Sequence, residues 1–480
     1  MSKQHSQRRR PRSSRDRRRP GRVRSCFLRS FCRSAGLQVA LVERDTIGGA
    51  CINRGCIPAK AFLETAAVRR QVAHASSFGI NASFEGLDFS TAQLRKQGIV
   101  ETLQKGLLGL TRSKKVQFVG GTGRLMPPLQ AGKHQVLVTH PSGTTQVLYA
   151  RNVVLATGST PRTIPNFDRS GAVLTSNEVL DLTEIPRRVL VVGGGAIGCE
   201  FASMFADLGA DVTIVEGALR ILAGVDADIA QVVTKSFRKK NIRIITDATC
   251  VSHAPSESGA TSVKINPGED LEVDAVVLAV GRKPCTEGLG LEETSVTVSP
   301  RGFVEVDEFC RTNVTSVFAV DDLIDTPQLA HVAYAEAVLV IKQILNETAI
   351  PVDYDRVPWA IYCHPEVAWA GLSETQAKEA GLEVVISKHQ FRSNSRAMII
   401  GETDGLVKVI ALKRKDGKAG QILGVHMTGT WVTEQLGAGY LAVNWEASVE
   451  EVAHLIQPHT SLSELFGETV IALTGRSINS

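Results

Sequence analysis

The hydrophobic pattern is clearest in the middle of the chain, where it predicts a strand, a helix and a second strand in close succession. Residues 189–192 form an unbroken apolar run, as in a strand that is covered on both faces of a parallel sheet. A glycine-rich loop follows, then a helical pattern over about 196–209 and a strand over 211–216. Residues 273–280 form another buried strand, so this region predicts a doubly wound α/β unit.

The N-terminal part carries a similar but incomplete pattern. Residues 36–43 predict a strand that ends on Glu43, which suits the second strand of a dinucleotide-binding unit. Residues 48–75 run from a Gly-Gly turn through a pair of cysteines into a helical pattern, 88–112 continue with helical periodicity, and 115–160 are rich in strand patterns. A first strand and its glycine loop should precede the strand that ends on Glu43, but the sequence contains neither.

From about residue 351 onward the pattern becomes mixed, which predicts a separate α+β domain. The elements expected there are two strands, 406–411 and 422–426, and three amphipathic helices, 373–381, 431–443 and 448–456.

Length and charge change this picture in two ways. A chain of 480 residues is too long for one hydrophobic core, and we expect two to four domains. The net charge of +5 belongs to the head: residues 1–34 contain twelve Arg and one Lys against one Asp, a charge of +12, so the rest sums to −7. No apolar run reaches about 18 residues, and the head lacks the apolar core of a secretory signal, so neither a membrane span nor secretion is expected.

The basic head at 1–34 allows three interpretations: a basic arm that binds nucleic acid or membrane, an organellar transit peptide, or a stretch read out of frame. A transit peptide would precede the missing first strand, whereas this head takes its place, which favours the third interpretation. One codon assignment for residues 16–26, shifted by one base, encodes Ile-Gly-Gly-Gly-Pro-Ala-Gly-Tyr-Val-Ala-Ala, a dinucleotide-binding loop with the start of its helix.

The loop Gly193-Gly-Gly-Ala-Ile-Gly198 has the G-x-G-x-x-G spacing between a strand and a helix. Its glycines permit a tight turn, close backbone approach to a pyrophosphate and close helix packing, and the helix N-terminus attracts phosphate. Glu216 ends the next strand and can accept hydrogen bonds from both ribose hydroxyls. It would repel a 2′-phosphate, which favours NAD over NADP, although Arg220 lies nearby.

Among nine cysteines, only Cys51 and Cys56 form a patterned pair. In a regular helix, residues five apart have Cα atoms about 8–9 Å apart, which exceeds the roughly 7 Å that a disulfide spans. We therefore expect Cys51 to precede the helix proper and Cys56 to lie near its first turn, where a thiol pKa is lowered. The residues that allow this distortion are Gly48, Gly49, Gly55 and Pro58.

Residues 48–60, Gly-Gly-Ala-Cys-Ile-Asn-Arg-Gly-Cys-Ile-Pro-Ala-Lys, closely resemble the redox-disulfide signature of the class I pyridine nucleotide–disulfide oxidoreductases. Other segments resemble the family's second flavin motif (156–159), the return to its flavin domain (279–284 and 319–322) and its C-terminal acid–base motif (458–464). The resemblance covers about residues 36–475.

The resemblance implies an α/β fold with two Rossmann-like dinucleotide-binding domains plus a C-terminal α+β dimerisation domain. The expected division is an aberrant head at 1–34, a FAD-binding domain at 35–160 that resumes at 281–350, an NAD-binding domain at 161–280 and a dimerisation domain at 351–480.

The resemblance also implies roles for single residues. Cys56 matches the thiol that contacts the flavin, and Cys51 matches the interchange thiol that meets the substrate. Lys60 matches the lysine near flavin N5, with Glu200 as its carboxylate partner. The expected cofactor-binding residues for FAD and NAD are Glu43, Lys60, Gly123, Thr157, Gly158, Ser159, Gly193, Gly195, Ile197 (which gates the nicotinamide pocket), Gly198, Glu200, Glu216, Gly281, Asp322 and Ala330.

His459 and Glu464 match the family's acid–base pair. An imidazole suits proton transfer to and from a thiolate near neutral pH, and a carboxylate raises its pKa and fixes its tautomer. In this family the pair is supplied by the other subunit, so the resemblance implies a homodimer. Asp321 departs from the family pattern, which has glycine there, and adds a negative charge close to the flavin pyrophosphate.

Within the family the chain is most similar to dihydrolipoamide dehydrogenase, because its tail lacks the cysteine pair of mercuric reductases and Glu216 disfavours NADP. This implies NAD-dependent oxidation of protein-bound dihydrolipoamide in the cytoplasm, with the lipoyl-bearing acyltransferase of a 2-oxo-acid dehydrogenase complex as partner. No metal, nucleic-acid partner or membrane partner is expected. The alternatives are a mercuric or other disulfide reductase, and an inactive dimer that lacks FAD because the first glycine loop is missing.

Overall fold

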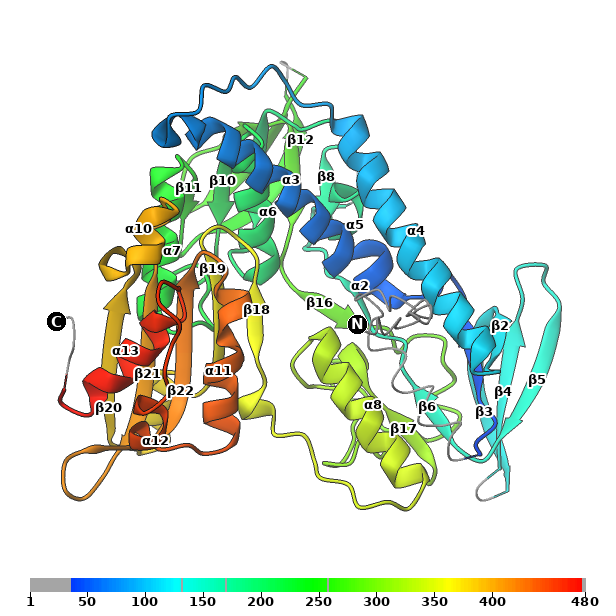
Figure 1. Ribbon diagram of the computed structural model, residues 1–480. Coiled ribbons are helices and arrows are strands. Elements are labelled where there is room, and N and C mark those ends of the chain that lie inside the picture. Colours follow the sequence, from blue (N-terminus) through cyan, green and yellow to red (C-terminus); the bar gives the residue numbers. More distant parts are fainter. Residues whose placement is uncertain (1–35, 131–132, 169–170, 257–258, 477–480) are drawn as a thin grey trace, which may run out of the picture.

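The computed structural model describes residues 36–130, 133–168, 171–256 and 259–476. The basic head predicted at 1–34 lies outside these residues. Figure 1 shows three lobes: one at the top, drawn mostly in green, one at the lower right, drawn in blue, cyan and yellow-green, and one at the lower left, drawn in orange and red.

The upper lobe is built on five parallel strands, which confirms the doubly wound α/β prediction for this region. The strand order is β11 (Arg243–Ile245), β10 (Asp211–Val215), β9 (Arg188–Val192), β15 (Ala275–Leu278) and β8 (Val173–Thr175). Strand β9 is central, because strands pair with it on both sides. Its side chains are nearly all buried, as expected for a parallel sheet with covered faces. Helices α5 (Ser176–Val179), α6 (Ala196–Asp207) and α7 (Ala227–Lys239) and the antiparallel strands β12 (Thr249–Pro255), β13 (Thr261–Asn266) and β14 (Leu271–Val273) complete the lobe.

The lower right lobe contains two separate pairs of parallel strands. The pairs are β1 (Ala40–Glu43) with β2 (Gln117–Gly120), and β6 (Val153–Leu155) with β17 (Val317–Ala319). An antiparallel sheet of β3 (Thr122–Gln130), β4 (Lys133–Thr139) and β5 (Thr145–Ala150) lies beside them, and the helices are α2 (Gly49–Arg54), α3 (Cys56–His74), α4 (Phe89–Ser113) and α8 (Ala330–Ile344). Strands β7 (Ser159–Pro161) and β16 (Arg282–Pro284) pair where the chain passes between the two lobes.

The two strand pairs of the right lobe correspond to the two halves of the upper sheet. Pair β2–β1 matches β11–β10, since each is parallel and its second strand ends at or next to a glutamate, Glu43 or Glu216. Pair β6–β17 matches β15–β8, because β6 and β15 each follow a three-stranded antiparallel sheet, β3–β5 or β12–β14. In the upper sheet β9 joins the two halves, but among the described residues no strand joins β1 to β6. The interruption lies where the sequence analysis expected a first strand and found none.

The side chains record the same difference. Val154 on β6 is 42% exposed, whereas Val277 at the matching place on β15 is 0% exposed. On β1 no residue is fully buried, whereas three of the five residues on β10 are. The right lobe therefore lacks part of the cover that a five-stranded parallel sheet normally has.

The lower left lobe is the α+β domain predicted from residue 351 onward. Its antiparallel sheet has the order β18 (Trp359–Ile361), β19 (Glu366–Gly371), β22 (Ala419–Gly429), β21 (Leu406–Lys413) and β20 (Val384–Gln390). Its helices are α9 (Glu374–Glu379), α10 (Ser395–Ile399), α11 (Val432–Asn444), α12 (Val449–Ala453) and α13 (Glu464–Leu473). Helix α7 of the upper lobe contacts this sheet at β22, so the two lobes pack directly together.

Two further observations complete the fold. Residues 48–75, expected to pass from a Gly-Gly turn through the cysteine pair into a helix, form two helices, α2 and α3, with a break at Gly55. Within the described part of the chain, no helix is both long and apolar enough to cross a membrane.

Candidate active site

The cysteine pair lies at the junction of α2 and α3. Cys56 is the first residue of α3, as predicted, but Cys51 lies inside the short helix α2 rather than before any helix. The junction depends on Gly55, because a Cβ atom there would lie 3.1 Å from the carbonyl oxygen of Ala50. The break brings the two thiols, both free in this structure, within hydrogen-bonding distance of each other.

The two thiols have opposite electrostatic environments. The hydrogen bond from Cys51 and, to a smaller extent, the positive charge of Lys60 together lower the pKa of Cys56 to about 7, against the opposing effect of burial. The same hydrogen bond raises the pKa of Cys51, and burial adds to this rise. In the reduced pair, the thiolate therefore forms on Cys56 and the proton stays on Cys51.

Lys60 projects from α3 toward the upper lobe and binds Glu200 on α6. Its Nζ lies 2.8 Å from each carboxylate oxygen of Glu200. Burial opposes the ammonium charge, but Glu200 outweighs it, so the pKa of Lys60 is raised. Tyr362 was missed by the sequence analysis: its backbone N–H donates to Glu200 at 2.9 Å, and Lys60 Nζ lies 4.8 Å from the centre of its ring. All three lobes thus contribute to the surroundings of the cysteine pair.

The nucleotide loop between β9 and α6 requires its glycines for steric reasons. A Cβ atom on Gly198 would lie 1.9 Å from the carbonyl oxygen of Gly193, and one on Gly193 would lie 2.5 Å from the carbonyl oxygen of Ala279. Gly195 has open space beside it and precedes the first turn of α6, where phosphate can approach the backbone. Ile197, the second residue of α6, lies half-buried in that first turn.

Glu216 is held in place directly after β10. Its carboxylate accepts hydrogen bonds from the backbone N–H of Gly194 at 2.6 Å and of Ala218 at 2.8 Å. Arg220 donates to the carbonyl oxygens of Leu222 and Val225 at 3.0 and 2.9 Å, so its guanidinium group is engaged inside its own loop. The loop therefore presents a carboxylate to the ribose and holds its arginine elsewhere, which agrees with the preference for NAD inferred from Glu216.

The predicted flavin residues of the right lobe gather near the β7–β16 pair. The hydroxyl of Ser159 donates to Asp322, and Arg282, which the sequence analysis missed, donates to Ser159 Oγ at 2.6 Å. The hydroxyl of Thr157 donates to the carbonyl oxygen of Cys285 at 2.8 Å. The structure therefore brings Thr157, Ser159 and Asp322 together from segments that are far apart in the sequence.

Asp321 occupies a position that favours glycine. Its φ is +69°, and a Cβ atom on Gly158 would lie 3.2 Å from its carboxylate. Burial and the charge of Asp322 raise the pKa of Asp321 to about 6. Its backbone N–H donates to Glu336 at 2.7 Å, a buried carboxylate on α8 that the sequence analysis also missed.

Four other predicted cofactor-binding residues lie on further segments. Glu43 ends β1 and accepts a hydrogen bond from the N–H of Asp45 at 3.0 Å. Gly123 lies on β3, where a Cβ atom would approach Val42 to 3.2 Å. Ala330 begins α8, and Gly281 adopts a φ of +99° just before β16.

The described residues fit FAD at its ring end, where the cysteine pair and Lys60 lie. At the pyrophosphate they provide no counterpart of the loop that follows β9, because no described strand lies between β1 and β6. The NAD site fits throughout, since the loop at 193–198, helix α6 and Glu216 are all in place. Within the same described residues, no cluster of side chains suits a metal ion.

His459 and Glu464 form a pair on the C-terminal lobe. His459 Nδ1 lies 3.0 Å from Glu464 Oε1, and the imidazole is 74% exposed. The backbone N–H of Ser461 also donates to this carboxylate at 2.8 Å, and these bonds lower the pKa of Glu464 against the opposing effect of burial. Figure 1 places α12 and α13, which flank the pair, in the lower left lobe and α2 in the centre. Within one chain, the histidine is therefore separate from the cysteines.

Comparison with known proteins gives one consistent result. Residues 27–337 match the family model for pyridine nucleotide-disulphide oxidoreductases, and residues 357–470 match that family's dimerisation domain. A dihydrolipoyl dehydrogenase of Bacillus subtilis is 36% identical over 92% of this chain and 94% of its own, and one of Chlamydia pneumoniae is 34% identical over 92% and 93%.

Solved structures agree. LpdA of Mycobacterium tuberculosis superposes with a TM-score of 0.86 at 26% identity, covering 94% of this chain and 96% of its own. The flavoprotein disulfide reductase RclA of Escherichia coli gives a TM-score of 0.83 at 25% identity, covering 94% and 97%. With a family model spanning well over half of its length, the chain belongs to the pyridine nucleotide–disulphide oxidoreductases.

Proposed function

We propose that this protein is an NAD-dependent flavoprotein that oxidises protein-bound dihydrolipoamide. The observation that carries the proposal is the cysteine pair, whose hydrogen bond and nearby Lys60–Glu200 pair stabilise a thiolate on Cys56. The family uses FAD and NAD, and curated relatives at 34–36% identity over about nine-tenths of the chain carry the name dihydrolipoyl dehydrogenase.

The proposed thiol chemistry starts from a Cys51–Cys56 disulfide. A substrate thiolate attacks Cys51 Sγ, the disulfide breaks, and Cys56 leaves as a thiolate. The second substrate thiolate then attacks the substrate sulfur bound to Cys51, which closes the lipoyl disulfide and releases Cys51, which is reprotonated. Two electrons pass from the substrate to the cysteine pair, and the low pKa of Cys56 makes it the better leaving group in the first step.

FAD, when bound, carries these two electrons from the cysteine pair to NAD⁺. Lys60 and Glu200 lie beside Cys56, where they hold positive charge near the flavin ring and connect the flavin and nucleotide lobes. Glu216 positions the adenosine ribose of NAD, and the N-terminus of α6 faces its pyrophosphate. Ile197, in the first turn of α6, is the residue proposed to gate the nicotinamide pocket.

We assign His459 of the partner subunit as the base that removes the proton from the substrate thiol. The partner subunit's Glu464 orients this imidazole. Support comes from the exposure of the imidazole and its separation from the cysteines of its own chain. The match to the family's dimerisation domain supports a homodimer. Large apolar side chains are also exposed on this lobe, among them Trp445 at 77% and Leu441 at 45%, as expected for a surface that is covered in a dimer.

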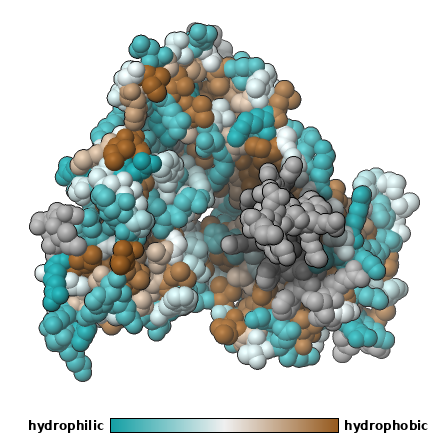
Figure 2. Space-filling model, viewed as in Figure 1, coloured by the Kyte–Doolittle hydropathy of each residue, from teal (hydrophilic) through white to brown (hydrophobic). Residues whose placement is uncertain are grey.

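The lower lobes leave an open cleft between them. It measures about 680 Å³ and is lined by Val338 and Leu339 of α8 and by Leu436 and Tyr440 of α11. Figure 2 shows the space-filling surface hollowed between these lobes.

We propose a domain for each part of the chain. The lower left lobe, residues 351–480, is the dimerisation domain. Residues 35–160 together with 281–350 form the FAD-binding domain, and residues 161–280 form the NAD-binding domain.

The proposed physiological partner is the lipoyl-bearing acyltransferase of a 2-oxo-acid dehydrogenase complex, in the cytoplasm. Its support is the name of the curated relatives and the free state of all seven cysteines among the described residues, which suits a reducing compartment. Neither a nucleic acid nor a membrane is proposed as a partner.

The direct test is the formation of NADH from dihydrolipoamide and NAD⁺ by the purified, flavin-loaded protein. Cys51→Ser and Cys56→Ser should each abolish it, whereas Cys250→Ser, which changes a cysteine on β12 outside the pair, should leave it intact. If the flavin-loaded protein forms no NADH but reduces another disulfide with NADPH, the proposed activity is wrong and the protein is a different kind of disulfide reductase within the family.

A further inference from the structure

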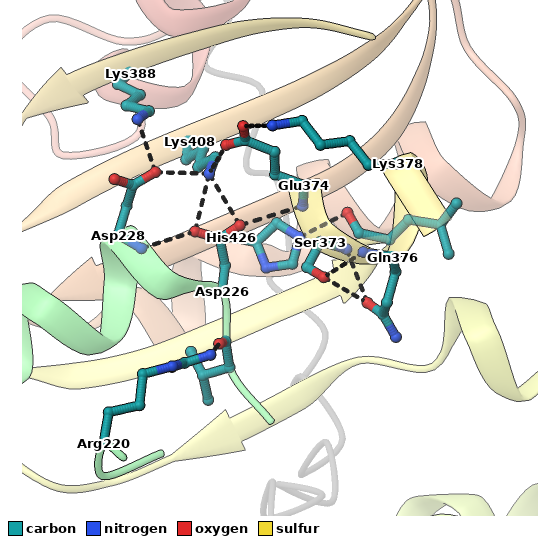
Figure 3. A network of polar contacts seen from close by, with 12 residues as sticks. Arg220, Asp226, Asp228, Ser373, Glu374, Gln376, Lys378, Lys388, Lys408 and His426 are labelled. Carbon is teal, nitrogen blue, oxygen red and sulfur yellow. Dashed lines mark hydrogen bonds and ion pairs between the residues drawn. The ribbon is translucent and has the colours of Figure 1, made fainter. Parts of the chain in front are cut away.

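Lys408 is a buried cation that joins the upper lobe to the C-terminal lobe (Figure 3). Its side chain, on β21, is 1% exposed. Its Nζ lies 2.9 and 3.0 Å from the two carboxylate oxygens of Asp226, 2.6 Å from Asp228 and 2.8 Å from Glu374. Asp226 and Asp228 belong to the upper lobe, at the start of α7, whereas Glu374 begins α9 of the C-terminal lobe.

The charges around Lys408 balance. Lys388 pairs with Asp228 at 2.7 Å, and Lys378 pairs with Glu374 at 2.7 Å, so three ammonium groups face three carboxylates. Burial opposes the charge of Lys408, but its carboxylate partners outweigh burial and raise its pKa. The lysine therefore stays charged, and because Asp226 is itself 2% exposed, Lys408 is the cation that compensates it.

His426 lies opposite Lys408 across the β21–β22 pair and is buried as well. Its Nε2 lies 2.9 Å from the carbonyl oxygen of Leu372, and burial lowers its pKa, so it stays neutral at physiological pH. It adds no second positive charge next to Lys408.

Asp226 is the last residue of the loop that starts at Glu216 and borders the nucleotide site. This loop folds back on the glycine loop, because the N–H of Leu222 donates to the carbonyl oxygen of Gly194 at 2.8 Å. Ile221 packs over Gly194 so closely that a Cβ atom there would lie 2.6 Å from its side chain. The beginning of the loop is thus fixed to the nucleotide site and its end to Lys408.

Arg220 holds several residues of this loop together through hydrogen bonds to their carbonyl oxygens. It donates to the carbonyl oxygens of Leu222, Ala223 and Val225 at 2.8–3.0 Å, immediately before Asp226. A displacement of Asp226 is therefore passed along the loop to the backbone that bonds Gly194.

We propose that Lys408 is a positioning residue for the NAD site: it anchors the loop that holds Glu216 at the adenosine ribose, and so makes nucleotide affinity depend on the C-terminal lobe. The proposal rests on the proposed NAD site. It assigns Lys408 no contact with the nucleotide, only with the far end of the loop that borders it.

The test compares NADH with reduced nicotinamide mononucleotide, which lacks the adenosine half. Both are titrated by nucleotide fluorescence against the full-length protein. Lys408→Met should weaken NADH binding about tenfold, which corresponds to about 1.4 kcal/mol, and should change binding of the mononucleotide less than about twofold. Equal weakening of both nucleotides, or of neither, would overturn the proposal, because a merely structural role cannot select for the adenosine half.

The chain offers a matched control. Lys239→Met removes another ion pair between α7 and the C-terminal lobe, Lys239 with Asp404 at 2.7 Å, but an exposed one that does not hold the loop. It should leave both nucleotides unaffected. If Lys408→Met fails to fold, Asp226→Asn keeps the size and the helix cap and should still weaken NADH selectively, by about threefold. No selective loss in that variant overturns the proposal.

Two outcomes separate this proposal from the proposed function. Cys51→Ser should lose dihydrolipoamide oxidation yet keep the preference for NADH over the mononucleotide, because it does not touch the loop. If the unaltered chain itself shows no such preference, the loop has no adenosine contact to position, and the proposal fails whatever the turnover assay shows.

Discussion

The chemistry of the cysteine pair rests on single charges and hydrogen bonds. The pKa of Cys56 is lowered to about 7 by its bond with Cys51 and by the ammonium group of Lys60. Lys60→Met removes the cation, so we expect the pKa of Cys56 to rise by about one unit. The pH dependence of iodoacetamide alkylation of the reduced protein measures this shift directly.

Cys250 serves as an internal reference for that experiment. Burial raises its pKa to about 11, and it lies on β12, away from Lys60. Its alkylation should therefore remain confined to alkaline solution in both proteins. An unchanged alkylation profile for Cys56 in Lys60→Met would show that the lysine does not stabilise the thiolate.

Asp321 gives a prediction with a defined pH dependence. Its folded-state pKa is raised to about 6 from an ordinary value of 3.8, so folding favours the protonated carboxyl. That contribution is complete below the ordinary pKa and is lost as the pH rises through about 6. Asp321→Gly removes the buried charge and the strain that a positive φ imposes on a residue with a side chain. It should raise the free energy of unfolding by about 1–2 kcal/mol at pH 7.

The gain should be smaller at pH 4, where the carboxyl of Asp321 is largely protonated in the folded protein. Urea unfolding at both pH values separates the two contributions of Asp321, its backbone conformation and its charge. Equal gains at pH 4 and pH 7 would mean that backbone conformation alone accounts for the effect.

At the scale of elements, two glycines in the turn from β9 into α6 have different roles: Gly198 is needed for folding and Gly195 for nucleotide binding. Gly198→Ala would force a Cβ atom to within 1.9 Å of the Gly193 carbonyl oxygen, so it should destabilise the upper lobe by about 3 kcal/mol or abolish folding. Gly195→Ala meets open space, so the fold should be unaffected. It should nevertheless weaken NADH binding at least about tenfold, because the pyrophosphate approaches the backbone there.

Thermal unfolding and NADH titration of the two variants distinguish these effects. Tight NADH binding by Gly195→Ala would contradict the placement of the pyrophosphate at this loop. A stable Gly198→Ala would contradict the steric reason given for the third glycine.

The same elements show what the sequence could predict. The strand and helix patterns around the nucleotide loop were correct, with α6 and β10 within two residues of their expected ends, because each element carries its own period. The start of α3 at Cys56 agrees with the prediction, but the short helix α2 that contains Cys51 was not expected, since its two N-terminal glycines indicated a turn.

The residues that the sequence analysis missed share a physical reason. Tyr362, Arg282 and Glu336 act through contacts with segments more than ten residues away, such as the bond from the Tyr362 N–H to Glu200. No local pattern marks such a residue, because its partner is chosen by the packing of whole lobes. The Lys408 network has the same origin, since it exists only where α7 meets the C-terminal sheet.

At the scale of the whole molecule, the separation of His459 from the cysteines predicts complementation between subunits. Cys51→Ser and His459→Gln homodimers should both be inactive. After they are mixed, dissociated and reassociated, half of the dimers should be heterodimers with one intact site each, giving about a quarter of the normal activity. No recovery in mixtures that demonstrably exchange subunits would place the histidine in the same chain's site.

The order of strands predicts what the flavin lobe needs. In the upper sheet, β9 joins β10 to β15 and carries the glycine loop, whereas β1 and β6 are not joined within the described residues. Parallel sheets in such folds hold the pyrophosphate at the loop after the central strand, so tight FAD binding should require a strand and glycine loop between β1 and β6. We therefore expect a chain whose residues before Gly36 are replaced by a strand–glycine-loop–helix unit to retain close to one FAD per subunit, and the present chain to retain less. The flavin-to-protein absorbance ratio of the two purified proteins measures this, and equal ratios would show that the residues already present suffice. Sequencing the underlying DNA adds an independent check, because the out-of-frame interpretation of residues 1–34 requires that a shifted frame encode such a loop.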